Sequence, residues 1–135
     1  MPSISDSTMT LLQKVLDLRA DNERVIASNI ANSETPGYAP ARFEFEEQLR
    51  LAVDKGAFAI KTTHANHLPV APASLADVTG RVVQEKDTSG IGDQNGVSLD
   101  HEMLALAENE LLYETAAQLL NKKLTIRKYI IQGGQ

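Results

Sequence analysis

The sequence predicts a mainly α-helical fold in which two long terminal helices form an antiparallel coiled coil, joined by a partly ordered middle segment with short strands and loops. Apolar residues recur in alternating steps of four and three near both ends, which is the spacing of a helix–helix seam. Most glycines and prolines lie between those ends. We therefore expect an N-terminal coiled-coil helix over residues 1–33, an irregular middle over 34–97 and a C-terminal coiled-coil helix over 98–135.

The first helix is predicted from about Ser5 to Asn32. Its end is sharp, because Thr35 precedes a proline and is disfavoured in the helical region, and Pro36-Gly37 suits the central pair of a type II turn. A second apolar row flanks the seam. The seam residues are Leu11, Val15, Leu18, Asn22, Val25, Asn29 and Asn32, and the flanking residues are Leu12, Leu16, Ile26 and Ile30.

Three asparagines, Asn22, Asn29 and Asn32, lie on that predicted seam. A polar residue at a seam position costs stability but fixes the register of pairing and the number of partners. The alternative is that these side chains face solvent near a fraying helix end. The spacing alone leaves both interpretations open.

The middle segment contains two runs that predict short strands, "FAIKTT" at 58–63 and "VTGRVVQ" at 78–84. The run "FEFEEQLRLAV" at 43–53 predicts a short helix. The run "KDTSGIGDQNG" at 86–96 has the composition of a turn-rich linker. A segment of this kind cannot form a strong core of its own, so we expect it to be labile to protease in the free chain, as are the termini.

The last helix is predicted from Ser98 to Ile131. Ser98 or Asp100 can cap its start, and Gly133 with Gly134 can end it. Its predicted seam is Leu99, Met103, Leu106, Glu110, Tyr113, Ala117, Leu120, Leu124, Arg127 and Ile131, with a flanking row of Leu112, Ala116, Leu119, Ile126 and Ile130.

A pair of helices is thin, and the second apolar row on each helix cannot be covered by the other. Exposed apolar stripes of this length indicate a further partner. Two arrangements satisfy them: a four-helix bundle made by dimerisation, or a subunit of an extended helical assembly. Periodicity does not distinguish between the two.

Several functional classes are disfavoured by composition and motifs. A net charge of −5 without a basic cluster argues against nucleic acid, and the absence of cysteine excludes disulfides and thiolate metal sites. His64 and His67 stand near Pro69 in a loop-like stretch and lack a third ligand at motif spacing. No nucleotide-binding or nucleophile motif is present. We expect no catalytic, cofactor or metal site and no small-molecule substrate. The N-terminal residues also lack the pattern of a secretory signal.

One run is specific. "ASNIANSETPGY", residues 27–38, resembles the Ala-x-Asn-Ile-Ala-Asn-x-x-Thr-Pro-Gly-Tyr motif of the flagellar axial proteins, which are rod, hook and hook-associated subunits. The following "APARFEFEEQL", then "FAIKTTHANHLP" and "NGVSLDHEMLALAENELLYETAAQLLNKKL", resemble the proximal rod proteins, the B-type rod subunits. The resemblance covers nearly all of residues 10–133. The chain departs from the family pattern at loop positions, such as Ser33-Glu34 and Ala39-Pro40.

The resemblance implies a structural subunit of the bacterial flagellar basal body rod, which assembles helically and connects the membrane ring and export gate to the distal rod. Such a protein is exported by the flagellar type III apparatus without a cleaved signal and is placed in the periplasmic space. Its expected partners are other rod subunits, further copies of itself, membrane-ring and export-gate components and the ring–rod junction protein. The alternative is a cytosolic helical adaptor or export chaperone that dimerises through the same heptads.

The resemblance and the heptads together give two sets of candidate residues. The expected subunit-contact residues are Asn29, Asn32, Thr35, Pro36, Gly37, Tyr38, Arg42, Phe43 and Phe45. The expected helix-pairing residues are Leu11, Val15, Leu18, Val25, Leu106, Tyr113, Leu120 and Leu124.

Overall fold

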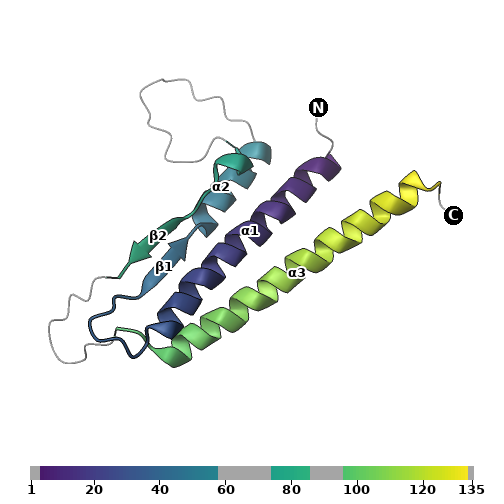
Figure 1. Ribbon diagram of the computed structural model, residues 1–135. Coiled ribbons are helices and arrows are strands. Elements are labelled where there is room, and N and C mark those ends of the chain that lie inside the picture. Colours follow the sequence, from purple (N-terminus) through teal and green to yellow (C-terminus); the bar gives the residue numbers. More distant parts are fainter. Residues whose placement is uncertain (1–3, 58–73, 86–95, 134–135) are drawn as a thin grey trace, which may run out of the picture.

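Two long helices dominate the molecule (Figure 1). The computed structural model describes residues 4–57, 74–85 and 96–133. Helix α1 (Ile4–Ala31) and helix α3 (Leu99–Ile131) lie side by side and run in opposite directions, so that α1 begins and α3 ends at the same end of the molecule. At a rise of 1.5 Å per residue, α1 is roughly 42 Å long and α3 roughly 50 Å. The predicted mainly helical fold with paired terminal helices is confirmed.

Contacts between side chains define the register of the two helices. Asn22 contacts Asn109, and one heptad further along α1 Asn29 contacts Glu102. Near the other end, Arg127 forms an ion pair with Asp6. Each step toward the end of α1 is therefore a step toward the start of α3, as antiparallel pairing requires. The seven-residue spacing is that of a coiled-coil seam.

The seam of α3 is displaced by one residue at four of its ten predicted positions. Asn109 and Ala116 are the buried residues of α3, whereas the prediction placed Glu110 and Ala117 there. Of the other predicted seam residues, Leu106, Leu120 and Arg127 are partly buried, whereas Leu99 and Tyr113 are exposed. The displacement has a physical reason: the positions that face α1 hold polar or small side chains, which a search for apolar periodicity does not detect.

The end of α1 and the turn after it match the prediction. The helix ends at Ala31, within one or two residues of the expected position. The amide of Tyr38 then donates to the carbonyl of Thr35 over 3.2 Å, and Gly37 has a φ of 75°. A positive φ at the third residue is the requirement of a type II turn, and glycine meets it without strain.

A two-stranded antiparallel sheet follows the turn. Strand β1 (Ala41–Glu44) pairs with β2 (Arg81–Gln84), with Phe43 opposite Val82. The prediction of a strand at 78–84 is therefore confirmed in its second half. The predicted helix over 43–53 starts later, as α2 (Glu46–Ala57), because residues 41–44 alternate between partly buried and exposed side chains and form β1 instead.

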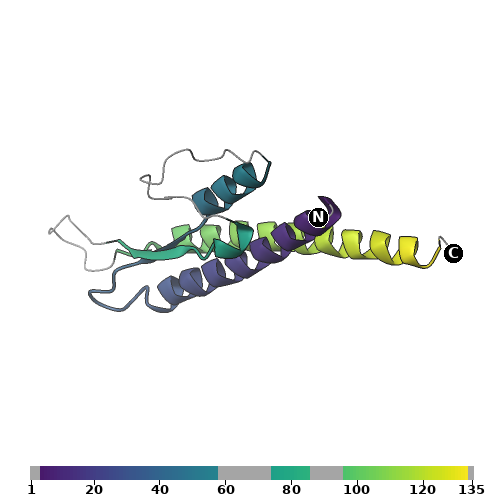
Figure 2. The same ribbon diagram turned by 90° about the horizontal axis from the view of Figure 1, so that it is seen from above.

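The buried core lies between α1 and the middle segment. Its residues are Leu18, Phe45, Ala52 and Val78, and Val78 directly follows the short 3₁₀ helix η1 (Leu75–Asp77). In Figure 1 the helix α1 lies between the sheet and α3, and Figure 2 shows α2 standing off one face of that layer. The described parts of the middle segment thus pack on α1 rather than forming a separate core.

Some predicted features lie outside the described residues: the strand at 58–63, the histidines His64 and His67, Gly134 and almost all of the linker at 86–96. None of the described helices combines the length and the apolar character needed to span a membrane.

Helix α2 carries ion pairs on its surface. Arg50 pairs with Glu47 and Asp54, and the hydrogen bond that Arg50 donates to Glu47 lowers the pKa of the exposed Glu47 carboxyl.

Candidate subunit-contact site

Asn29 is the centre of the site. It lies in the last turns of α1, and only 2% of it is exposed. Its Nδ2 donates to the carbonyl of Ala41 over 2.8 Å and to Glu102 Oε2 over 3.1 Å. Its Oδ1 accepts from the amide of Ala41 over 2.9 Å and from the Tyr38 hydroxyl over 3.1 Å. A carboxamide has two donors and two acceptor positions, so its hydrogen-bonding capacity is fully used. One side chain thus joins α1, the turn, β1 and α3.

The turn itself is tied to the end of α1. Asn32 Nδ2 donates to the carbonyl of Ser28 over 2.8 Å, and the Thr35 hydroxyl donates to Asn32 Oδ1 over 3.3 Å. The Tyr38 hydroxyl also lies 3.3 Å from Ser28 Oγ. These bonds hold the tip of the turn, Pro36-Gly37, at the surface beyond the helix end.

The two phenylalanines after the turn lie against the body of the molecule. Their ring centroids are 5.4 Å apart. Phe45 is buried, and the Arg19 guanidinium lies 4.9 Å from the centroid of its ring. The ring of Phe43 covers Gly80, where a Cβ would come within 2.3 Å of it. This stretch is therefore anchored internally, and only Arg42 and Glu44 between and beside the rings are exposed.

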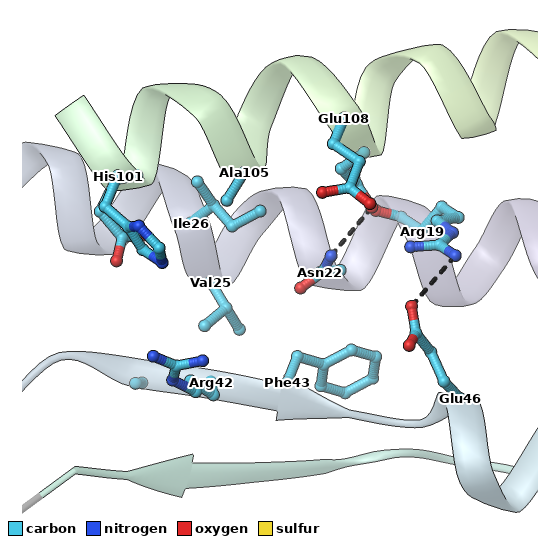
Figure 3. Close-up of a pocket in the computed structure, with 13 residues that line it drawn as sticks. Arg19, Asn22, Val25, Ile26, Arg42, Phe43, Glu46, His101, Ala105 and Glu108 are labelled. Atoms are coloured by element: carbon cyan, nitrogen blue, oxygen red, sulfur yellow. Dashed lines mark hydrogen bonds and ion pairs between the residues drawn. The ribbon is translucent and has the colours of Figure 1, made fainter. Parts of the chain in front are cut away.

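A groove of about 310 Å³ runs between α1, α3 and β1 (Figure 3). Arg19 reaches across it to Glu46 Oε1 at 3.2 Å, and Asn22 binds Asn109 within its wall. His101 and other polar side chains of α3 line the opposite side. Arg19 Nε is buried and has no hydrogen-bond partner within the described part of the chain. No group of metal-binding side chains occurs in residues 4–57, 74–85 and 96–133.

The structure distributes the nine expected subunit-contact residues over three depths. Thr35, Pro36, Gly37 and Arg42 are exposed. Asn32, Tyr38 and Phe43 are half-buried, while Asn29 and Phe45 are buried. The exposed residues form an accessible tip and one flank of β1. The buried residues hold those two surfaces in place.

The eight expected helix-pairing residues also differ in their surroundings. Leu18 is buried against Phe45, Ala52 and Val78 of the middle segment. Tyr113 and Leu124 are exposed at 38% and 45% in the single chain. The remaining residues are half-buried: Leu11, Val15, Val25, Leu106 and Leu120.

Sequence reasoning missed the partners of the seam asparagines. Asn109 is buried, and besides binding Asn22 it donates to the carbonyl of Arg19 over 2.9 Å. Asn109 lies one heptad from both Glu102 and Ala116, and this spacing is the signal that could have identified it. Asn22 and Asn29 lie within the helix pair rather than facing solvent, as the seam interpretation predicts. Asn32 follows the end of α1 and donates to the carbonyl of Ser28 instead, so the seam interpretation is wrong for this residue.

The chain is similar in sequence to several flagellar basal body rod proteins. No protein-family model matches the chain. A flagellar basal body rod protein FlgB from Yersinia enterocolitica is 30% identical over 137 residues, which cover 96% of each chain. The FlgB proteins of Salmonella typhimurium and Bacillus subtilis are each 29% identical; the first covers 96% of each chain, and the second 98% of this chain and 99% of the relative. These relatives give the chaperone alternative no support.

Proposed function

Because the chain belongs to the FlgB family of flagellar basal body rod proteins, we propose that it builds the membrane-proximal part of the rod and connects the membrane ring and export gate to the distal rod. The protein is a structural subunit of the flagellar basal body and not an enzyme. Membership of a rod protein family also implies assembly with other basal body components.

The observation that carries the proposal is the exposed apolar surface of α3. Leu104 and Ile130 are each 68% exposed, Leu111 is 65% exposed and Ile131 is 83% exposed. Helix α1 covers one side of α3 only, and a helix with apolar side chains on several sides is normally buried in an assembly. Neighbouring subunits in a rod would supply that burial. A head-to-tail contact of this kind does not close on itself and so builds a helical tube.

We further infer roles for the two sets of candidate residues. The exposed tip Thr35-Pro36-Gly37 and the flank at Arg42 meet a neighbouring subunit, while Asn29 and Phe45 fix the geometry of those surfaces from below. The half-buried helix-pairing residues unite α1 and α3 within a subunit, while Leu18 holds the middle segment on α1. The exposed Tyr113 and Leu124 extend the pairing to a neighbour. We also propose that residues 1–33 and 98–135 are the two helices of the coiled-coil core and that residues 34–97 are an irregular middle segment.

The specific partners that we propose are other rod subunits, further copies of this chain, the membrane-ring and export-gate components and the ring–rod junction protein. We place the assembled protein in the periplasmic space and propose that it is exported by the flagellar type III apparatus without a cleaved signal. The resemblance of residues 27–38 to the axial protein motif supports both inferences.

The test is deletion of the gene followed by electron microscopy of purified basal bodies. We expect rings without a rod, and restoration of the rod by the wild-type gene on a plasmid. Intact rods in the deletion strain would contradict the proposal. Mass spectrometry of wild-type basal bodies supplies the second readout: a rod subunit is present in them, whereas a cytosolic protein is absent.

A further inference from the structure

The charges of α3 are separated along its length. All of its carboxylates lie in the first half of the helix, and all of its lysines and arginines lie in the second half. The acidic residues are Asp100, Glu102, Glu108, Glu110 and Glu114, and the basic residues are Lys122, Lys123, Arg127 and Lys128. Complementing the helix dipole explains charges in the terminal turns only, because the dipole effect falls off within the first and last turn.

Most of these charges are unused within the subunit. Glu102 accepts a hydrogen bond from Asn29, and Arg127 pairs with Asp6. Among the described residues, the other seven charged side chains of α3 form no ion pair. All of them except Lys123 are exposed. A helix of this length therefore presents one acidic half and one basic half to its surroundings.

Exposed apolar side chains accompany both halves. Leu104 and Leu111 lie in the acidic half, while Ile126 and Ile130 lie in the basic half. The same surface thus offers apolar area for burial along its whole length and opposite charge at its two ends. The apolar area supplies affinity to a partner, and the charge pattern selects the alignment of that partner.

We propose that the outer surface of α3 binds a second copy of this chain that points in the same direction and is shifted along the helix by about half its length. The inference rests on the proposed function, because copies in a helical rod all point the same way. Two such copies in register would place like charges side by side, which is unfavourable. A shift by half of α3, roughly 25 Å at 1.5 Å per residue, places the acidic half of one copy beside the basic half of the next.

The first experiment exchanges charges on exposed positions and follows self-association by sedimentation equilibrium at low salt. The Glu110→Lys/Glu114→Lys variant and the Lys122→Glu/Lys128→Glu variant should each self-associate about tenfold more weakly than wild type. An equimolar mixture of the two should associate again, because each now carries the charge that the other needs. The control is Asp17→Lys/Glu23→Lys on α1, which changes the net charge as much as the first variant does and should leave association unchanged.

The second experiment determines direction and shift. The chain contains no cysteine, so a single introduced cysteine takes a spin label at one known place. Labels at the exposed positions Thr115→Cys and His101→Cys should both report an intermolecular distance of about 25–30 Å, because a shift is the same at every residue. An antiparallel pair centred on the helix would give about 10 Å at the first position and about 45 Å at the second.

Three results would overturn the proposal: a wild-type chain that stays monomeric at its highest soluble concentration, a mixture of charge variants that does not associate, or the antiparallel pair of distances. Each is distinguishable from failure of the proposed function, which is read from the rods of the deletion strain. A rod that needs this protein, combined with antiparallel distances, would reject the shifted arrangement and keep the function.

Discussion

Asn29 connects four parts of the chain through one carboxamide. It is buried, and its four hydrogen bonds reach Ala41 twice, Tyr38 and Glu102. The groups that it binds include the backbone N–H and C=O of Ala41, which a smaller side chain would leave without these partners. Buried polar groups that lose a partner cost far more free energy than the bond contributed while it was made.

We therefore expect Asn29→Ala to lower the free energy of unfolding by about 3 kcal/mol, measured by urea denaturation followed by circular dichroism. The matched control is Asn121→Ala, since Asn121 is exposed on α3 and its side chain makes no bond within the described residues. That variant should be within about 0.5 kcal/mol of wild type. Equal effects of the two substitutions would show that Asn29 has no special role.

Two glycines allow the cost of backbone strain to be measured apart from the cost of a steric clash. Gly37 and Gly80 both have a positive φ, 75° and 69°. A Cβ on Gly37 would meet nothing within 4 Å, whereas a Cβ on Gly80 would lie 2.3 Å from Cζ of Phe43. Gly37→Ala should cost about 1 kcal/mol from the left-handed conformation alone.

Gly80→Ala should cost at least about 2–3 kcal/mol, because the same strain is joined by displacement of the Phe43 ring. Thermal unfolding of both variants under identical conditions measures the difference. The double variant Gly80→Ala/Phe43→Leu removes the ring. The loss of stability caused by Gly80→Ala should therefore be smaller in the Phe43→Leu background than in wild type. A Gly80→Ala variant as stable as Gly37→Ala would refute the steric account.

At the scale of elements, the pairing of α1 with α3 shows what the sequence can predict. Alternating apolar spacing, which Leu11, Val15, Leu106 and Leu120 follow, predicted both helices, and their places at the two ends of the chain predicted antiparallel pairing. The spacing misplaced four of the ten α3 seam positions, where the residues facing α1 are polar or small. Those positions are recognisable only once the facing residue of α1 is known, because the hydrogen bond from Asn22 is what stabilises Asn109 at its buried position.

The sheet and the site were less accessible to sequence reasoning. Four residues per strand give a weak alternation, and β1 finds its partner across a long connection in the sequence. The motif at 27–38 predicted a region of subunit contacts, but it gave no sign that Asn29 within it is buried. Which residues of a motif face outward depends on packing against β1 and α3, and α3 lies far from the motif in sequence.

The Asn22–Asn109 pair should be coupled. Asn109→Leu alone leaves Asn22 without its partner and is expected to cost about 1–3 kcal/mol of stability. Asn22→Leu/Asn109→Leu replaces the pair by apolar contact and should recover much of that loss. A double-mutant cycle from urea denaturation gives the coupling energy, which we expect to be about 1 kcal/mol or more. Strict additivity of the two single effects would contradict a direct interaction.

At the scale of the whole molecule, stability and assembly should be separable. Arg42 is exposed on β1 and pairs with Glu85, while Arg24 is exposed on α1 and pairs with Asp21. Exposed ion pairs contribute about 0–1 kcal/mol, so Arg42→Ala and Arg24→Ala should both unfold close to wild type.

Only Arg42→Ala should reduce swimming in soft agar and the yield of complete rods, because only that residue lies on the proposed contact flank. Complementation of the deletion strain with each variant measures both quantities. Equal motility of the two strains, with equal amounts of each protein in the cells, would remove Arg42 from the contact surface.

The two hydrogen bonds between Asn29 and Ala41 also protect the free chain from aggregation before it is assembled. A sheet of two strands has open edges, and an open edge is a template on which a strand of another molecule can add. At Ala41 the carboxamide of Asn29 occupies both the N–H and the C=O, as the peptide group of an added strand would do. The Asn29 side chain thus blocks that edge at Ala41, because the backbone groups that an added strand would bind are already hydrogen-bonded. An Asn29 variant should therefore aggregate through β-type contacts as well as unfold more easily.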